Sequence, residues 1–220
     1  MASPVALVLG AGANVGMSVA RAFAAEGYRI ALVARSPPKE DADKYLHIRG
    51  DLADPSCISS IFEQVKSELG VPQVVIYNAA DGFGDALAVP VADFARSLAI
   101  NTTSVYAAAQ AATAGFKTLP SGGTFIFTGN CTNTAPLPSL SGNSIGKAAT
   151  ATLIQVLVGS EHKGEHSRYY YADERTADGA AVYSAIDGDA HAEHYMTLAR
   201  QPTQGPWLQT FVKGVGYKAF

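Results

Sequence analysis

Three glycines near the start of the chain, Gly10, Gly12 and Gly16, have the spacing of a phosphate-binding turn. They follow a short apolar run, Val5–Leu9, and precede a segment with apolar residues at helical spacing that ends near Gly27. Because glycine has no Cβ, the backbone can turn tightly and a pyrophosphate can come close to it. The helix that follows would offer unpaired N–H groups and its positive dipole end to that anion. The pattern predicts a dinucleotide site between a buried strand and a helix.

The residues after the second predicted strand, Arg29–Ala34, indicate which dinucleotide binds. An acid at this position binds the ribose 2′-hydroxyl of NAD, whereas an arginine accommodates the 2′-phosphate of NADP. Here Arg35 and Ser36 follow the strand, and the first acid is Glu40. The sequence therefore favours NADP(H) as cofactor. The alternative is that Arg35 is an ordinary solvated side chain.

Composition and charge restrict the class of protein. The chain has 220 residues, of which 48% are hydrophobic and 16% charged, as in a soluble α/β protein. A net charge of −3 gives no reason to expect nucleic acid or a membrane as partner. No apolar run approaches the roughly 20 residues of a membrane span, and we expect no signal peptide ahead of the first strand. Cys57 and Cys131 are predicted to be reduced thiols, so the expected location is the cytoplasm.

Further strands and helices must position the glycine turn. Apolar runs predict additional strands, and apolar residues at helical spacing predict helices between them. The strands are Tyr45–Arg49, Val74–Tyr77 and Thr124–Thr128; the helices run from Asp54 to Leu69, from Val91 to Leu119 and from near Asn143 onward, the last after an irregular loop over 129–142. This alternation predicts an α/β fold: a single Rossmann-type, doubly wound parallel sheet with helices on both faces.

The last quarter of the chain has two interpretations. Ser167–Ala172 is either a sixth parallel strand or part of a hairpin that turns at Asp178-Gly179. A helix over Asp189–Arg200 and a final strand over Trp207–Lys213 follow. We expect one dinucleotide-binding domain over residues 1–220, with a Rossmann core (1–160) and a divergent C-terminal segment (161–220). The Tyr169–Tyr171 run is interpreted as packing or an interface.

Several motifs occur in the order in which the short-chain dehydrogenase/reductase family has them. The turn LGAGANVG resembles that family's TGxxxGxG motif, with Asn14 in place of the middle glycine. The resemblance implies a cofactor site of Gly10, Gly12, Asn14, Val15, Gly16, Arg35, Ser36, Asp51, Leu52, Asn78, Ala79, Ala80 and Lys147. It also implies that Asn101 holds a water in a proton relay and that Lys147 is the lysine of the YxxxK motif.

The catalytic centre departs from the family pattern. Counting back from Lys147, the position of the family's tyrosine is occupied by Asn143. An amide has no proton to exchange near neutral pH, so Asn143 cannot be the general acid/base. The family's serine falls near Thr128 to Asn130, and either residue could hydrogen-bond a carbonyl oxygen. The candidate catalytic residues are therefore Lys147, Asn101, Thr128, Asn130 and Asn143.

Four of these residues also have a purely structural interpretation. Lys147 could be a solvated lysine, and Asn101 could patch a helix irregularity with its side chain. Asn130 and Asn143 could be a turn residue and a helix N-cap, because asparagine is favoured at both. The histidines His162, His166, His191 and His194 do not have the spacing of a metal site, so no metal is expected.

Three functions remain open. The first is an NADP(H)-dependent oxidoreductase that acts on a carbonyl or imine small molecule; an iminium would need no proton donor. The second is a non-redox isomerase or cyclase on the same scaffold, and the third is a catalytically silent nucleotide- or partner-binding protein. The region that forms the substrate lid in the family is shortened here. The resemblance implies a homodimer or homotetramer through the helices around Ser104 to Ala114 and after Lys147.

Overall fold

A computed structural model describes residues 3–36, 43–82, 84–160 and 167–220. In these residues one sheet has the strand order β3-β2-β1-β4-β5-β6-β7-β8. All neighbours pair in parallel except β7 and β8, which are antiparallel. The strands are β1 (Val5–Leu9), β2 (Arg29–Ala34), β3 (Leu46–Arg49), β4 (Val74–Tyr77), β5 (Thr124–Thr128), β6 (Arg168–Arg175), β7 (Leu208–Val212) and β8 (Gly216–Tyr217).

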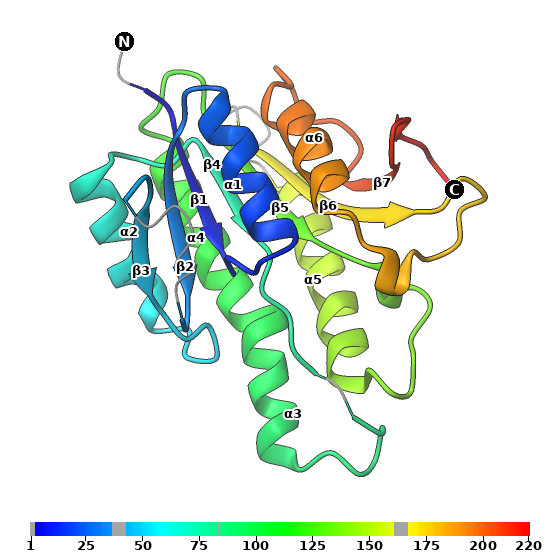
Figure 1. Cartoon of the computed structure of the whole chain (residues 1–220). Coiled ribbons are helices and arrows are strands. Elements are labelled where there is room, and N and C mark those ends of the chain that lie inside the picture. The colour runs from blue at the N-terminus through cyan, green and yellow to red at the C-terminus, as the bar shows by residue number, and fades with distance from the viewer. Residues whose placement is uncertain (1–2, 37–42, 83, 161–166) are drawn as a thin grey trace.

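Helices cover both faces of this sheet (Figure 1). α1 (Val15–Ala25) and α6 (Gly188–Ala199) pack against each other on one face. α2 (Cys57–Glu68), α4 (Ser104–Phe116) and α5 (Ser141–Gly159) bury their apolar residues on the other. The predicted doubly wound, Rossmann-type α/β fold is confirmed. None of the helices in the described ranges combines the length and apolarity that a membrane crossing requires.

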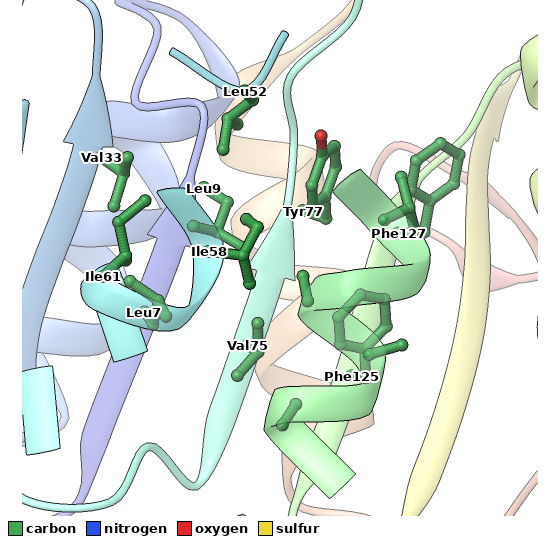
Figure 2. Close-up of a cluster of buried hydrophobic side chains, with 14 of the residues drawn as sticks. Leu7, Leu9, Val33, Leu52, Ile58, Ile61, Val75, Tyr77, Phe125 and Phe127 are labelled. Atoms are coloured by element: carbon green, nitrogen blue, oxygen red, sulfur yellow. The ribbon is translucent and has the colours of Figure 1, made fainter. Parts of the chain in front are cut away.

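The strands alternate their side chains between two apolar cores, because successive residues of a strand point to opposite faces. In β1, Leu7 and Leu9 join the core under α2 and α4, whereas Ala6 and Val8 join the core under α1 and α6. Figure 2 shows Leu7 and Leu9 beside side chains of neighbouring strands and of α2. Each fully buried leucine of this kind contributes about 1.5–3 kcal/mol. These cores hold the carboxyl ends of the strands at one edge, where the site lies.

The long helix predicted from Val91 to Leu119 is interrupted. α3 (Val91–Leu98) is followed by a π-helical turn, Ala99–Thr103, and then by α4, which ends at Phe116. A π turn adds one residue per turn and is not visible in hydrophobic spacing. The next helix begins at Ser141 and not near Asn143, and the preceding loop contains a short 3₁₀ helix, Cys131–Asn133. The strands predicted over Val5–Leu9, Arg29–Ala34, Val74–Tyr77 and Thr124–Thr128 have the observed ends, and the ends of the other elements differ by at most three residues.

The structure distinguishes between the two interpretations of Ser167–Ala172. β6 pairs in parallel with β5, so it is a sixth parallel strand, and it continues to Arg175. The hairpin is wrong as the main pairing, although Asp178-Gly179 does form a tight turn: Gly179 has φ +90° and its N–H donates to Thr176 O. The predicted strand Trp207–Lys213 is β7, but it is not the last, because β8 follows the turn at Gly214.

Candidate active site

The glycine turn joins β1 to α1 and closes against the end of β4. Gly10 has φ +99°, and a Cβ there would lie 2.4 Å from the backbone N of Ala79. At Gly12 a Cβ would meet no atom within 4 Å, so this backbone faces open space. The side chain of Asn78 donates to Gly10 O at 2.8 Å and ties the turn to β4. This geometry fits a pyrophosphate at the N-terminus of α1.

The remaining predicted residues of the turn take different places. A Cβ on Gly16 would lie 2.8 Å from Ala11 Cα, so this glycine allows α1 to start close to the turn. Asn14 does not line the cleft beside Gly10 and Gly12; its Nδ2 donates to Ile186 O at 3.0 Å. Val15 is buried and lines a second cavity. Of these residues, Asn14 has a contact with the C-terminal segment that the sequence did not predict.

A cleft of about 510 Å³ lies over the carboxyl ends of β1 to β4. It contains most of the predicted cofactor residues: Gly10, Gly12, Arg35, Ser36, Asp51, Leu52, Asn78, Ala79 and Ala80. Arg35 and Ser36 are exposed at its rim, whereas residues 37–42, including Glu40, lie outside the described residues. The structure therefore brings the turn, the arginine and the end of β4 to one cleft.

Asp51 places a carboxylate in this cleft. Its Oδ1 accepts from the N–H of Ala53 at 3.0 Å, and its Oδ2 lies 3.4 Å from Nη1 of Arg96. The Ala53 N–H, and secondarily Arg96, hold the pKa of Asp51 below its ordinary value. The group is therefore an ionised hydrogen-bond acceptor at neutral pH.

A second cavity of about 500 Å³ adjoins the cleft and shares Asn78 and Ala80 with it. One part of its wall comes from the β5–α5 region and includes Lys147. Another part comes from the C-terminal segment, including Tyr183 and Ile186. A molecule in the cleft could therefore extend directly into this cavity, which is lined by four of the five candidate catalytic residues, Thr128, Asn130, Asn143 and Lys147.

Lys147 is buried at the base of the second cavity. Its Nζ donates to the carbonyl oxygen of Thr128 at 2.5 Å and lies 4.2 Å from the centroid of the Phe127 ring. Burial lowers the pKa of Lys147 to about 7, against the opposing influence of the Asp173 carboxylate. Its interpretation as a solvated lysine is therefore wrong. The amine can gain and lose a proton near neutral pH.

Asn143 belongs to a buried network of amides. Nδ2 of Asn130 donates to Oδ1 of Asn143 at 3.2 Å, and Thr132 Oγ1 lies 3.2 Å from the same oxygen. Nδ2 of Asn143 donates to Asp81 O at 3.3 Å. The N-cap of α5 is Leu140, so the N-cap interpretation of Asn143 is wrong. Each amide nitrogen has a second N–H that this network does not use.

Asn130 is fixed from two sides. Its Oδ1 accepts from the N–H of Thr132 at 3.0 Å and so caps the 3₁₀ helix, as the turn interpretation predicted. Its backbone carbonyl accepts a hydrogen bond from the hydroxyl of Tyr171 at 2.8 Å.

Thr128 is held by two hydrogen bonds. Its backbone carbonyl accepts from Nζ of Lys147, and its hydroxyl accepts from the hydroxyl of Tyr195 at 2.8 Å. Thr128 and Asn130 both line the second cavity.

Asn101 lies in the π turn and is fully buried. Its Nδ2 donates to Ser97 O at 3.0 Å and to Asp81 O at 2.8 Å, which confirms that it patches a helix irregularity. Its backbone carbonyl accepts from Thr150 Oγ1. Within the described residues its Oδ1 has no partner, and a buried polar atom of this kind is a place for an ordered water. Asn101 itself does not line the second cavity.

The sequence analysis missed two acids at the end of β6. Asp173 and Glu174 are buried and line the second cavity, as does His191, which the sequence did not single out from the other histidines. Adjacent acids at the carboxyl end of a parallel strand could have pointed to this site. The predicted strand ended at Ala172, so Asp173 and Glu174 were not recognised as strand residues. In the described part of the chain no group of three or more metal-ligating side chains is close enough to hold an ion. His162 and His166 lie outside that part.

A family model described as short chain dehydrogenase matches residues 4–164. The chain belongs to the short-chain dehydrogenase/reductase family. Membership makes this protein an oxidoreductase, in agreement with its sheet order and its glycine turn. The departure at Asn143 therefore occurs within a member of the family.

Similar proteins support the same assignment. The short chain dehydrogenase/reductase dmxR12 of Cryptosporiopsis sp. (strain 8999) is 40% identical over 237 aligned positions, covering 100% of this chain and 96% of that protein. A short-chain dehydrogenase/reductase structure from Mycobacterium marinum has a TM-score of 0.80 at 23% identity, covering 97% of this chain and 95% of the other. A metagenomic short-chain oxidoreductase in complex with NADP has a TM-score of 0.83 at 19% identity, covering 98% and 99%. The two structures establish likeness of fold.

Proposed function

We propose that this short-chain dehydrogenase/reductase is an NADP(H)-dependent reductase of a carbonyl or imine small molecule. The observation that carries the proposal is the junction of the two cavities. The cleft with the glycine turn and the cavity with Lys147 meet at Asn78 and Ala80. A dinucleotide held by the turn can thus present its nicotinamide end to a substrate beside the catalytic candidates.

The preference for NADP(H) is supported by the rim of the cleft. Arg35 and Ser36 follow β2 directly and are exposed there, so a guanidinium and a hydroxyl can meet a ribose 2′-phosphate. Asp51, held ionised by Ala53 N–H, belongs to the end of β3, where it can accept a hydrogen bond from an adenine amine. The metagenomic structural neighbour, which is in complex with NADP, shows the same fold.

The second cavity supports polarisation of a substrate carbonyl. The unused N–H groups of Asn130 and Asn143 are neutral donors that can stabilise negative charge on oxygen. Lys147 adds an amine whose pKa lies at about 7. When bound, the reduced nicotinamide supplies the hydride. The chain's own residues then orient the carbonyl and stabilise the charge on its oxygen.

We also propose a homo-oligomer. The outer surfaces of the helices on the α4 and α5 side carry exposed large apolar side chains, Tyr106, Ile145 and Val156. Such side chains gain free energy when another subunit covers them. Light scattering during size-exclusion chromatography distinguishes a dimer or tetramer from a monomer.

Titration of the purified protein with NADPH and with NADH tests the cofactor assignment. We expect calorimetry and nicotinamide fluorescence to show tighter binding of NADPH. The second step follows oxidation of bound NADPH by 1-tetralone, a flat apolar ketone, and by its N-methyl imine. Failure to bind either nucleotide would overturn the proposed function, and binding without oxidation would overturn the reductase assignment for these substrate classes.

A further inference from the structure

The amides proposed to polarise the carbonyl leave one requirement of the reaction unmet. Reduction of a ketone needs a proton as well as a hydride, and Asn143 has none to give. The wall of the second cavity also contains Glu174 from β6 and His191 from α6. Both side chains are buried, at 5% and 2% exposure. Neither side chain binds the cofactor or polarises the carbonyl in the proposed function.

Glu174 and His191 form a pair. Nδ1 of His191 lies 3.4 Å from Oε2 of Glu174, and the same Glu174 oxygen accepts from the N–H of Asp187 at 2.9 Å. Nδ1 also lies 2.8 Å from the backbone oxygen of Asp187. Because that oxygen can only accept, Nδ1 carries a hydrogen. Nε2 is then the ring nitrogen that can exchange a proton with a substrate.

The neighbouring acid is less suited to this work. Asp173 also lines the cavity, but its Oδ2 is bound to the guanidinium of Arg175, with Nη2 at 2.6 Å and Nε at 2.7 Å. Burial raises the pKa of Asp173 and Arg175 opposes that rise, so the protonation of this acid is tied to its guanidinium partner. Tyr183 is 62% exposed and Cys131 is an isolated thiol. Lys147 is the competing donor, and its ammonium is directed to Thr128 O.

We propose that His191, supported by Glu174, is the acid/base of this enzyme in place of the missing tyrosine; this inference rests on the proposed reductase function. In reduction, hydride adds to the carbonyl carbon and the π electrons move to the oxygen. That oxygen takes the proton from Nε2 of the His191 imidazolium, and the products are the alcohol, NADP⁺ and neutral His191. Solvent then returns the proton. In oxidation the neutral imidazole accepts the hydroxyl proton.

The surroundings of His191 set its pH dependence. Glu174 faces it from β6, Asp187 from the preceding loop, and the rings of Tyr195 and Phe211 from α6 and β7. His194 lies three residues on in α6, and Lys213 pairs with Asp187. Burial lowers the pKa of His191 below its ordinary value, although Asp187 opposes this. Reduction should therefore fall as pH rises through the His191 pKa.

The test compares His191→Gln and Glu174→Gln with His194→Gln. His194 is the matched control because it is on the same helix, equally buried and stacked on Phe211, but lines a different cavity. With NADPH and 1-tetralone, we expect kcat for His191→Gln to fall roughly 100-fold or more, as for loss of a general acid. The fall in turnover with rising pH should disappear with it, and Glu174→Gln should shift the pH at which turnover falls. NADPH affinity should be unchanged in all three, which also shows that the variants are folded.

The outcomes separate the inference from the proposed function. If His191→Gln keeps the turnover and pH profile of the wild type, the inference is overturned while the reductase function stands. If His194→Gln loses turnover to the same extent, the effect is structural and the inference is likewise overturned. If the wild-type protein binds NADPH but reduces neither 1-tetralone nor its imine, the proposed reductase function is overturned, and the inference with it. If turnover is lost in His191→Gln but kept in His194→Gln, the inference is supported.

Discussion

Nδ2 of Asn130 donates a hydrogen bond to Oδ1 of Asn143 at 3.2 Å, so the two side-chain amides act as one unit in the second cavity. The family pattern places its tyrosine at position 143 and its serine near positions 128–130. Hydroxyls that can transfer a proton are thus replaced by amides, which donate and accept hydrogen bonds but have no proton to transfer. Carbonyl polarisation and proton transfer must then be carried by different residues.

Asn143→Asp tests the polarising role of the pair. The substitution keeps an oxygen for Asn130 and Thr132 but removes the N–H groups of position 143 and adds a negative charge. We expect kcat for ketone reduction to fall by about 100-fold, the order found when one oxyanion donor is lost. NADPH affinity, measured by fluorescence, should change little. Unaltered kcat in a folded variant would show that Asn143 takes no part in the reaction.

Lys147 should make stability depend on pH. Its pKa is about 7 in the folded protein and 10.5 ordinarily, so between these values the unfolded chain binds more protons. The free energy of unfolding therefore rises with pH in this window, by at most about 1.4 kcal/mol per unit. Lys147→Met removes this contribution while other titrating groups stay. Denaturant unfolding at pH 7, 8 and 9 should show the wild type gaining stability relative to the variant; parallel curves would contradict the lowered pKa.

Arg35→Ala should weaken NADPH binding selectively. A guanidinium–phosphate hydrogen bond is worth about 1.5–3 kcal/mol, which corresponds to a loss of roughly 10- to 150-fold in affinity for NADPH. NADH affinity should change less than threefold, because NADH has no 2′-phosphate. Arg49→Ala is the charge-matched control, since Arg49 is also exposed and ends β3 but does not line the cleft. Calorimetry measures the affinity of each variant for NADPH and for NADH. Equal losses of affinity for both nucleotides in Arg35→Ala would refute the assignment of Arg35 to the 2′-phosphate.

Gly10→Ala and Gly12→Ala should have opposite consequences. At Gly10 the positive φ and the 2.4 Å approach to Ala79 N predict a loss of about 2–4 kcal/mol in the free energy of unfolding. At Gly12 the added methyl meets open space in the cleft, so stability should be retained while nucleotide affinity falls. Denaturant unfolding and nucleotide titration of the same two variants measure both effects. A stable Gly10→Ala protein would show that the turn can rearrange.

The sequence was most informative where a pattern is local. The strand–turn–helix unit from Val5 to Ala25 depends on apolar runs and glycines that are adjacent in the chain, and its predicted bounds agree closely with the structure. The π turn at Ala99–Thr103 was not predictable, because it depends on Asn101 bonding to Asp81 O and on Gly146 approaching it from α5. β8 is two residues long and has no periodicity of its own.

The candidate site was predictable in part for the same reason. The cofactor residues follow strands, so the order of motifs located them at one sheet edge. The environment of Asn143 depends on Asp81, 62 positions away, and on Asn130 and Thr132 across a loop. Glu174 and His191 meet only because β6 and α6 pack together in three dimensions. Spacing along the chain contains no signal for contacts of this kind.

The packing of α1 on α6 has a consequence for how the chain folds. Nδ2 of Asn14, at the start of α1, donates a hydrogen bond to the backbone oxygen of Ile186, which lies 172 positions later and just ahead of α6. During synthesis the apolar face of α1, with Val19 and Phe23, therefore has no α6 to cover it until almost the whole chain has emerged. Contacts of such high sequence separation form slowly, and apolar surface exposed in the meantime favours aggregation. We therefore expect the yield of folded protein to depend on chaperones that cover the apolar face of α1 until α6 has been synthesised.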